Sequence, residues 1–406
     1  MESKKRVAVI GGGAAGFFCA INLKELCPQA EVSILERGPR VLTKVEISGG
    51  GRCNCTNTFE GVSDLSSVYP RGHRLLKRLF HHFDHQDAYA WFERHGVPLT
   101  RQDDHCVFPK AQDSHAIIDC FLEHARRYGI RIATHHGVSS LEALAGYDAV
   151  CVAIGGSPTG KGLSWLRATG HEIEEPVPSL FSLSIKDSGL RDLMGIVAEQ
   201  AIAYLPGTKL RAQGPLLITH WGLSGPAILK LSSHGARLLH QNGYRMPLGI
   251  NWTGENESAV RTCLEQAATE HPQRQLSTAP PLRLQQRLWS YLVGKSTDCR
   301  TGLRWCDIGK RDMNRLVSVL CSDSYETTGR APFKDEFVTC GGVSLRSIHP
   351  NTMESRVHPR LYFAGEVLDI DGVTGGFNFQ AAWTTGYVAA KSIAERLFSP
   401  NNLDKS

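Results

Sequence analysis

Three glycines near the N-terminus have the spacing of a phosphate-binding turn. Gly11, Gly13 and Gly16 lie between two apolar segments, and Glu36 follows twenty positions after Gly16. Gly11 permits a tight turn, Gly13 lets the backbone approach a pyrophosphate, and Gly16 lets a helix pack closely on a sheet. A helix that begins here directs free N–H groups at phosphates, and Glu36 can bind a ribose diol. The pattern predicts a dinucleotide site; a glycine-rich turn without a ligand is the alternative.

A second glycine-rich stretch, near the other end of the chain, favours a flavin over a nicotinamide. Gly365 and Glu366 follow an apolar run, and residues 375–378 (GGFN) open an apolar helix that continues to about residue 397. Such a helix start can bring N–H groups to the pyrimidine edge of a flavin, where negative charge develops on reduction. We therefore expect FAD, with an ordinary terminal helix as the alternative. No second Gly-x-Gly-x-x-Gly follows a strand, so any NAD(P)H would bind transiently over the flavin.

Two further patterns indicate chemistry that we do not expect. Residues 155–162 nearly spell a P-loop, but Gly162 stands where a metal-binding hydroxyl is required. The paired histidines at 81–82 and 135–136 lack partners at the spacing of a structural zinc site. We expect neither an ATPase site nor a bound metal.

Short strands must bring these residues together. Residues 7–10, 32–35, 148–154 and 361–364 are apolar, and three of these runs end next to glycine. The carboxyl ends of parallel strands converge on one ligand, so the pattern predicts an α/β fold with a Rossmann-like FAD-binding domain. Between about residues 190 and 341, Gly-Pro pairs separate short strands, and from about residue 255 the chain looks helical and basic. We interpret these segments as insertions.

The composition is that of a globular protein with two or three domains. The chain has 406 residues, of which 41% are hydrophobic and 21% charged, and its net charge of +5 does not call for a polyanionic partner. The composition argues against disordered, fibrous and membrane-embedded classes, since no apolar run approaches the roughly 18 residues of a membrane span. The 12 scattered cysteines and the absence of a signal-peptide pattern predict a reducing, cytoplasmic location.

Several motifs resemble those of the bacterial NAD(P)/FAD-dependent, aminoacetone oxidase-like flavoprotein family. They occur in the right order over nearly the full chain: SGGGRCNCTN at 48–57, THWGLSGP at 219–226, TCGGV at 339–343, YFAGEVLD at 362–369 and GGFN at 375–378. One departure is His105-Cys106, where the family pattern has Gly-Arg, so an arginine role there is in doubt.

The resemblance implies three domains. These are a glutathione-reductase-like FAD domain of residues 1–190 and 342–406, a β-barrel-like domain of residues 191–254 and 331–341, and a helical insert of residues 255–330.

The resemblance also implies which residues hold the cofactor. The adenosine and pyrophosphate side comprises Gly11, Gly13, Ala14, Ala15, Gly16, Glu36, Arg37 and, near the adenine, Val138. The ribityl and flavin side comprises Gly365, Glu366, Gly376, Phe377 and Asn378, and Arg52, Ala153 and Gly155 complete the set.

Cys53 and Cys55 follow three glycines, in a segment that resembles the part of disulfide reductases carrying a redox-active pair beside the flavin. In those enzymes the cysteines lie further apart, and a Cys-x-Cys disulfide closes a small ring that is strained and easily reduced. Three interpretations stay open: a working redox pair, a single flavin-adjacent thiol at Cys53, and inert packing.

Arg52 is a stronger candidate for function than the thiols. Its fixed positive charge could stabilise an anionic reduced flavin or bind an acidic substrate. His220 could donate or accept a proton near a flavin, although a histidine bonded to nearby backbone is the alternative. The candidate catalytic residues are therefore Arg52, Cys53 and His220.

These features predict an FAD-dependent oxidoreductase. We expect hydride transfer through flavin N5 to or from a small organic substrate, with NAD(P)H as a possible donor and an organic double bond or dioxygen as acceptor. One alternative is a flavoprotein that acts on RNA, because residues 271–315 hold nine Lys and Arg against three Asp and Glu, with Trp289, Tyr291 and Trp305 among them. The other is a redox sensor that binds FAD without turnover.

Overall fold

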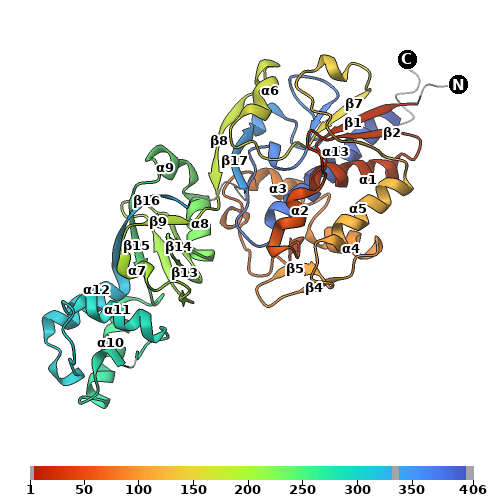
Figure 1. Cartoon of the computed structure of the whole chain (residues 1–406). Coiled ribbons are helices and arrows are strands. Elements are labelled where there is room, and N and C mark those ends of the chain that lie inside the picture. The colour runs from red at the N-terminus through yellow and green to blue at the C-terminus, as the bar shows by residue number, and fades with distance from the viewer. Residues whose placement is uncertain (1–3, 279, 332–337, 399–406) are drawn as a thin grey trace. The chain divides into compact units, whose positions relative to one another are not determined.

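The computed structural model of the chain divides into two compact units (Figure 1). The first comprises residues 1–177 and 338–406, and the second comprises residues 178–337. The structure describes residues 4–278, 280–331 and 338–398, so residues 1–3, 279, 332–337 and 399–406, which the expected domains include, lie outside the described residues. Both ends of the chain therefore contribute to one unit, as a shared dinucleotide site requires.

A five-stranded parallel sheet forms the centre of the first unit. Its order is β18 (Leu361–Phe363), β7 (Ala149–Val152), β1 (Arg6–Ile10), β2 (Glu31–Leu35) and β6 (Arg131–Ala133). The four predicted strands are thus neighbours, and β6 extends one edge. Residues 7–10 are all buried, because a parallel sheet is covered on both faces. The strand order confirms the expected Rossmann-like α/β fold.

Two helices from opposite ends of the chain pack against each other in this unit (Figure 1). They are α1 (Ala14–Leu26) and α13 (Phe377–Phe398). Gly386 of α13 permits the close approach, because a Cβ there would lie 2.9 Å from the carbonyl O of Ala15. The other α-helices of the unit are α2 (Thr43–Ile47), α3 (His73–Leu79), α4 (His85–Arg94), α5 (His115–Arg127) and α6 (Ser164–Ala168).

Two small sheets complete the first unit. β3 (Thr56–Asn57), β5 (Cys106–Pro109) and β4 (Leu99–Arg101) form an antiparallel sheet. β17 (Val338–Val343) pairs with β8 (Ile173–Ser179), whose residues 173–177 belong to this unit. The segments that follow β7 and β18 contain the 3-10 helices η4 (Lys161–Leu163) and η8 (Gly365–Val367).

An eight-stranded antiparallel sheet forms the second unit together with six α-helices of its described part. The strand order is β10 (Val197–Ala198), β13 (Leu216–Thr219), β14 (Gly222–Ser224), β9 (Leu183–Ile185), β16 (Asp323–Arg330), β15 (Pro247–Asn251), β11 (Ile202–Tyr204) and β12 (Arg211–Gln213). The helices are α7 (Ser188–Arg191), α8 (Pro226–His234), α9 (Ala236–Gln241), α10 (Glu257–Glu270), α11 (Gln286–Ser296) and α12 (Lys310–Ser322).

Sheet and helices of the second unit share one hydrophobic core. Its finer division into a β-barrel-like and a helical domain stays a prediction. In both units, no helix among the described residues has the length and apolarity to cross a membrane.

The close contact between α1 and α13 leads to a prediction about the stability of the folded chain. We expect Gly386→Val to lower the free energy of unfolding by about 2 kcal/mol, because the new side chain would press on the backbone of α1. Lys391→Ala, on an exposed part of the same helix, serves as control and should change it by less than about 0.5 kcal/mol. Urea denaturation followed by circular dichroism measures both, and equal midpoints for the two variants would contradict the prediction.

Candidate functional site

The turn between β1 and α1 has the shape of a dinucleotide cradle. Gly11 has a φ of +107°, and a Cβ there would lie 2.3 Å from the carbonyl O of Ala153. A Cβ on Gly16 would lie 2.0 Å from the carbonyl O of Gly11, whereas a Cβ on Gly13 would meet no atom within 4 Å. The absence of a side chain at Gly11 and Gly16 therefore lets the turn pack closely, whereas the backbone at Gly13 borders open space.

The N-terminus of α1 faces that open surface with unused hydrogen-bond donors. Gly13 is the N-cap, no side chain caps the helix, and its first turn carries no acidic residue. The hydrogen bond from Phe17 N to Gly13 O, 3.0 Å long, is the first of the helix. The N–H groups of Ala14, Ala15 and Gly16 precede it and therefore have no acceptor within the helix. A pyrophosphate fits such a site, and these residues are the ones that would hold it.

The expected adenosine residues gather at the carboxyl ends of β2 and β6. Glu36 accepts hydrogen bonds from Gly12 N (2.8 Å) and Gly38 N (2.6 Å), which fix its carboxylate beside the glycine turn. Arg37 is exposed, and Val138 packs partly buried against the core of the unit. The structure thus brings these residues to the edge of the sheet where the turn lies, while their contacts to a nucleotide stay predictions.

The C-terminal glycine stretch reaches the same turn. Gly365 has a φ of +75°, and a Cβ there would lie 2.7 Å from Cβ of Ala15, in the first turn of α1. Its N–H donates to Thr385 Oγ1 at 2.8 Å, which ties η8 to α13. Gly155, after β7, also has positive φ and open space where a Cβ would stand. Residues from three distant segments therefore share the dinucleotide edge.

The start of α13 is held by the segment 54–57. Asn57 Nδ2 donates to Gly375 O at 2.9 Å, and a Cβ on Gly376 would lie 2.3 Å from Thr56 O. With the Asn54 amide in the orientation that satisfies both of its groups, its O accepts from Gly376 N (3.2 Å) and its N donates to Thr56 O (2.9 Å). Sequence reasoning missed this role, although the run of short polar residues inside the 48–57 motif was its visible signal.

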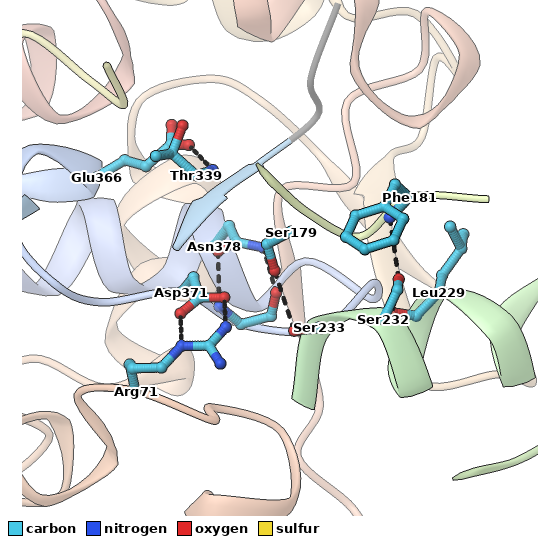
Figure 2. Close-up of polar contacts among 11 residues, drawn as sticks. Arg71, Ser179, Phe181, Leu229, Ser232, Ser233, Thr339, Glu366, Asp371 and Asn378 are labelled. Carbon is cyan, nitrogen blue, oxygen red and sulfur yellow. Dashed lines mark hydrogen bonds and ion pairs between the residues drawn. The ribbon is translucent and has the colours of Figure 1, made fainter. Parts of the chain in front are cut away.

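Further contacts stiffen the loop before α13. Asn378 Oδ1 accepts from Gly372 N at 2.8 Å, and its Nδ2 donates to Gly372 O at 2.9 Å. Figure 2 shows Arg71 facing Asp371, whose buried carboxylate binds the guanidinium group. Phe377 is buried, and its carbonyl accepts from Tyr69 Oη at 2.8 Å. The side chains of Phe377 and Asn378 thus order the loop, and their contact with FAD stays a prediction.

Arg52 is held in one place by three neighbours. Its guanidinium carbon lies 4.3 Å from the centroid of the Phe108 ring, its Nε donates to Gly49 O at 3.2 Å, and its Nη1 donates to Gln112 Oε1 at 3.3 Å. The cation is therefore fixed on a ring face, which limits the reorganisation needed to stabilise a nearby negative charge.

Cys53 and Cys55 are buried thiols that no disulfide joins. Burial raises the pKa of Cys53 to about 12, and it raises the pKa of Cys55 well above its usual value. Both groups are neutral near pH 7, and a thiolate nucleophile is disfavoured. A catalytic role of Cys53 stays a prediction that the electrostatics do not favour.

His220 belongs to the second unit. It stands in the turn between β13 and β14, is exposed, and makes an edge contact with the Trp221 ring at 4.3 Å between centroids. Its role as a proton donor stays a prediction.

The aromatic residues of the basic segment 271–315 give little support to the RNA alternative. Trp289 and Trp305 do not stand among the cations as exposed rings; they are buried and stacked with centroids 6.4 Å apart. The Tyr291 hydroxyl donates to Asp187 at 3.2 Å. Trp289 and Trp305 belong to the hydrophobic core that the helices share with the sheet, and Tyr291 packs against that core, so the three rings do not form an exposed platform for bases.

Fold and site together define the class of the protein. A parallel sheet with a glycine turn, an uncapped helix start and a C-terminal segment on the same edge is the architecture of an FAD-dependent oxidoreductase with a Rossmann-type domain. The profile of the HI0933-like protein Rossmann domain matches residues 5–392, and the chain therefore belongs to the HI0933-like family.

Relatives of two kinds share the full length of the chain. It is 28% identical to a 3-dehydro-bile acid delta(4,6)-reductase from Clostridium scindens, over 96% of this chain and 99% of that protein. It is also 28% identical to a ribosomal RNA dihydrouridine synthase from Escherichia coli, over 95% of this chain and 97% of that protein. Among solved structures, a flavocytochrome c3 fumarate reductase matches with a TM-score of 0.47 and 15% identity, over 97% of this chain and 78% of that one.

The open space at Gly13 leads to a prediction on cofactor binding. Gly13→Val should weaken FAD binding about 100-fold, because its side chain would separate the helix N–H groups from the pyrophosphate. The apoprotein should lose at most about 1 kcal/mol of stability, since the side chain meets no protein atom and an N-cap change costs about that much. Fluorescence titration with FAD measures the first quantity and thermal melting the second.

Gly11→Ala is the matched comparison, because its Cβ would collide with the backbone of Ala153. We expect it to lower the melting temperature of the apoprotein clearly. The prediction fails if Gly13→Val binds FAD as tightly as the wild type.

The burial of the two thiols predicts their reactivity. Brief iodoacetamide treatment of the native protein at pH 8 should label the exposed Cys299 and Cys306 and spare Cys53 and Cys55, because the latter are buried and protonated. Peptide mass spectrometry reads the sites, and unfolding in urea serves as control because it should make all four react. Native labelling of Cys53 as fast as Cys299 would show that the thiol is accessible and active.

Proposed function

We propose that the chain is an FAD-dependent reductase of a carbon–carbon double bond conjugated with a carbonyl group, in a small organic substrate, with NAD(P)H as electron donor. The observation that supports it most is the dinucleotide cradle, in which Gly13 is open above the uncapped start of α1 and Gly365 lies against Ala15. The family assignment already makes the chain an oxidoreductase, and the proposal adds the reaction type and the donor.

The names of the relatives support the choice of reaction. A delta(4,6)-reductase and a dihydrouridine synthase act on different molecules, but both names denote the saturation of a carbon–carbon double bond. In an oxo-diene steroid and in uracil, that bond is conjugated with a carbonyl, which makes its far carbon accept hydride. The shared chemistry comes to this chain as a proposal, and the substrate itself is not identified by it.

The residues of the first unit would bind and position rather than react. FAD, when bound, supplies the hydride carrier at N5. The N–H groups of Ala14–Gly16 would bind its pyrophosphate, and Glu36 would bind the ribose. Arg52, fixed over Phe108, would stabilise the negative charge that develops on the carbonyl oxygen when hydride reaches the double bond. One proton must then be added to complete the saturation.

Ribosomal RNA is the second candidate substrate. The full-length similarity to two ribosomal RNA dihydrouridine synthases, from Escherichia coli and Haemophilus influenzae, is the observation that favours it. The basic segment adds less than the sequence predicts, because Arg300 and Arg315 pair with Asp312 and Asp298. We therefore place the small-molecule substrate first.

Two finer assignments belong to the same proposal. The strand order with β1 between β2 and β7 is compatible with a glutathione-reductase-like arrangement, and the aminoacetone oxidase-like resemblance still depends on the sequence motifs. A redox sensor without turnover is not favoured by the family and the relatives.

Anaerobic flavin reduction followed by an oxidant panel tests the proposed function. We expect yellow protein whose flavin is bleached by NADH or NADPH and reoxidised by an oxo-diene steroid or a simple cyclic enone, with a product that has gained two hydrogen atoms by mass spectrometry. Reoxidation by unmodified ribosomal RNA alone, with formation of dihydrouridine, would favour the second candidate. Protein that does not take up FAD, or a reduced flavin that no member of the panel reoxidises, would contradict the proposal.

A further inference from the structure

A lysine that the sequence analysis did not single out contacts the dinucleotide edge. Lys44 stands in α2, and its Nζ lies 2.8 Å from Oε2 of Glu366, which is 322 positions away in the chain. The lysine side chain is 54% exposed and that of Glu366 only 19%. The ion pair therefore joins an exposed cation to a carboxylate that is largely enclosed.

The helix that carries Lys44 is anchored to the glycine turn. Leu42, at the N-cap of α2, donates its N–H to Gly12 O at 2.8 Å and has a positive φ of 59°, which turns the chain into the helix. A Cβ on Gly12 would also lie 2.5 Å from Cγ1 of Val41. The position of Lys44 is thus set by the same turn that would hold the pyrophosphate.

The second oxygen of Glu366 is bound as well. Its Oε1 accepts the N–H of Thr339 at 2.8 Å, as Figure 2 shows. A Cβ on Gly156 would lie 2.6 Å from this oxygen and 2.5 Å from Thr339 Oγ1, so the backbone after β7 closes the third side. Glu366 is therefore contacted by Lys44, by the Thr339 N–H and by the backbone at Gly156.

We propose that Lys44 is a positioning residue for the cofactor, acting through Glu366. Two physical effects carry the inference, which rests on the proposed use of FAD. The ammonium group orients a carboxylate that follows β18, where the ribityl chain is expected, and it offsets the negative charge of Glu366 beside a doubly charged pyrophosphate. Without the ammonium group, the carboxylate would rotate more freely and repel the cofactor.

Three variants of the full chain test the role of Lys44. Apoprotein is titrated with FAD, and the dissociation constant is followed by flavin fluorescence. Lys44→Met, which keeps the length but removes the charge, should weaken binding about tenfold, since a charge-assisted hydrogen bond is lost. Lys44→Arg should stay within about twofold of wild type, because the charge and a donor remain. Lys391→Met, which removes an exposed lysine paired with Glu395, is the control and should bind FAD like the wild type.

A double-mutant cycle separates positioning from general stabilisation. In a Glu366→Gln background, Lys44→Met should lose most of its tenfold effect, because the carboxylate through which it acts is gone. The melting temperatures of the apoproteins should agree, which a merely structural role of the ion pair would not allow.

The outcomes distinguish this inference from the proposed function. Wild-type binding of FAD by Lys44→Met, or independent effects of Lys44→Met and Glu366→Gln, overturns the inference alone. Failure of the wild-type apoprotein to bind FAD overturns both.

Discussion

The fit of Gly365 and Gly386 against the first helix is the constraint on which the rest of the first unit depends. A Cβ at Gly365 would lie 2.7 Å from Cβ of Ala15, and a Cβ at Gly386 would lie 2.9 Å from the carbonyl O of Ala15. Segments from opposite ends of the chain can approach this closely only where a side chain is missing. Because this contact involves the first turn of α1, it also places the C-terminal glycines beside the N–H groups that a pyrophosphate needs.

Polar contacts around α13 also preorganise the C-terminal segment, in addition to the close glycine packing. Asn54, Asn57 and the Arg71–Asp371 pair hold the loop before the helix through contacts within the chain itself. A cofactor that binds there meets N–H groups that already have their orientation, so little conformational entropy is lost on binding. The same holds for Glu36, whose two oxygens are bound by the backbone.

The sequence predicted those features that depend on backbone conformation. The roles of Gly11, Gly13 and Gly16 follow from local geometry, and the four apolar runs became neighbouring strands because parallel strands carry an unbroken apolar pattern. Contacts between distant side chains were missed, as with Lys44 and Glu366, since nothing local pairs two residues 322 positions apart. The burial of Trp289 was likewise not evident from the sequence, because it lies on a helical apolar face with Leu288 and Leu292 inside a segment rich in arginine.

The chemistry that this chain can contribute depends on which of its side chains can exchange protons and which carry a fixed charge. Cys53 and Cys55 hold their protons near neutral pH because burial opposes the thiolate, so neither is suited to carry charge in a reaction. Arg52 presents a guanidinium cation over the Phe108 ring, and the N–H groups at the start of α1 are fixed dipoles. Groups of this kind stabilise charge without moving protons. In the proposed function, the first unit would therefore bind the redox cofactor and set its electrostatics, while the cofactor itself would supply the electron transfer.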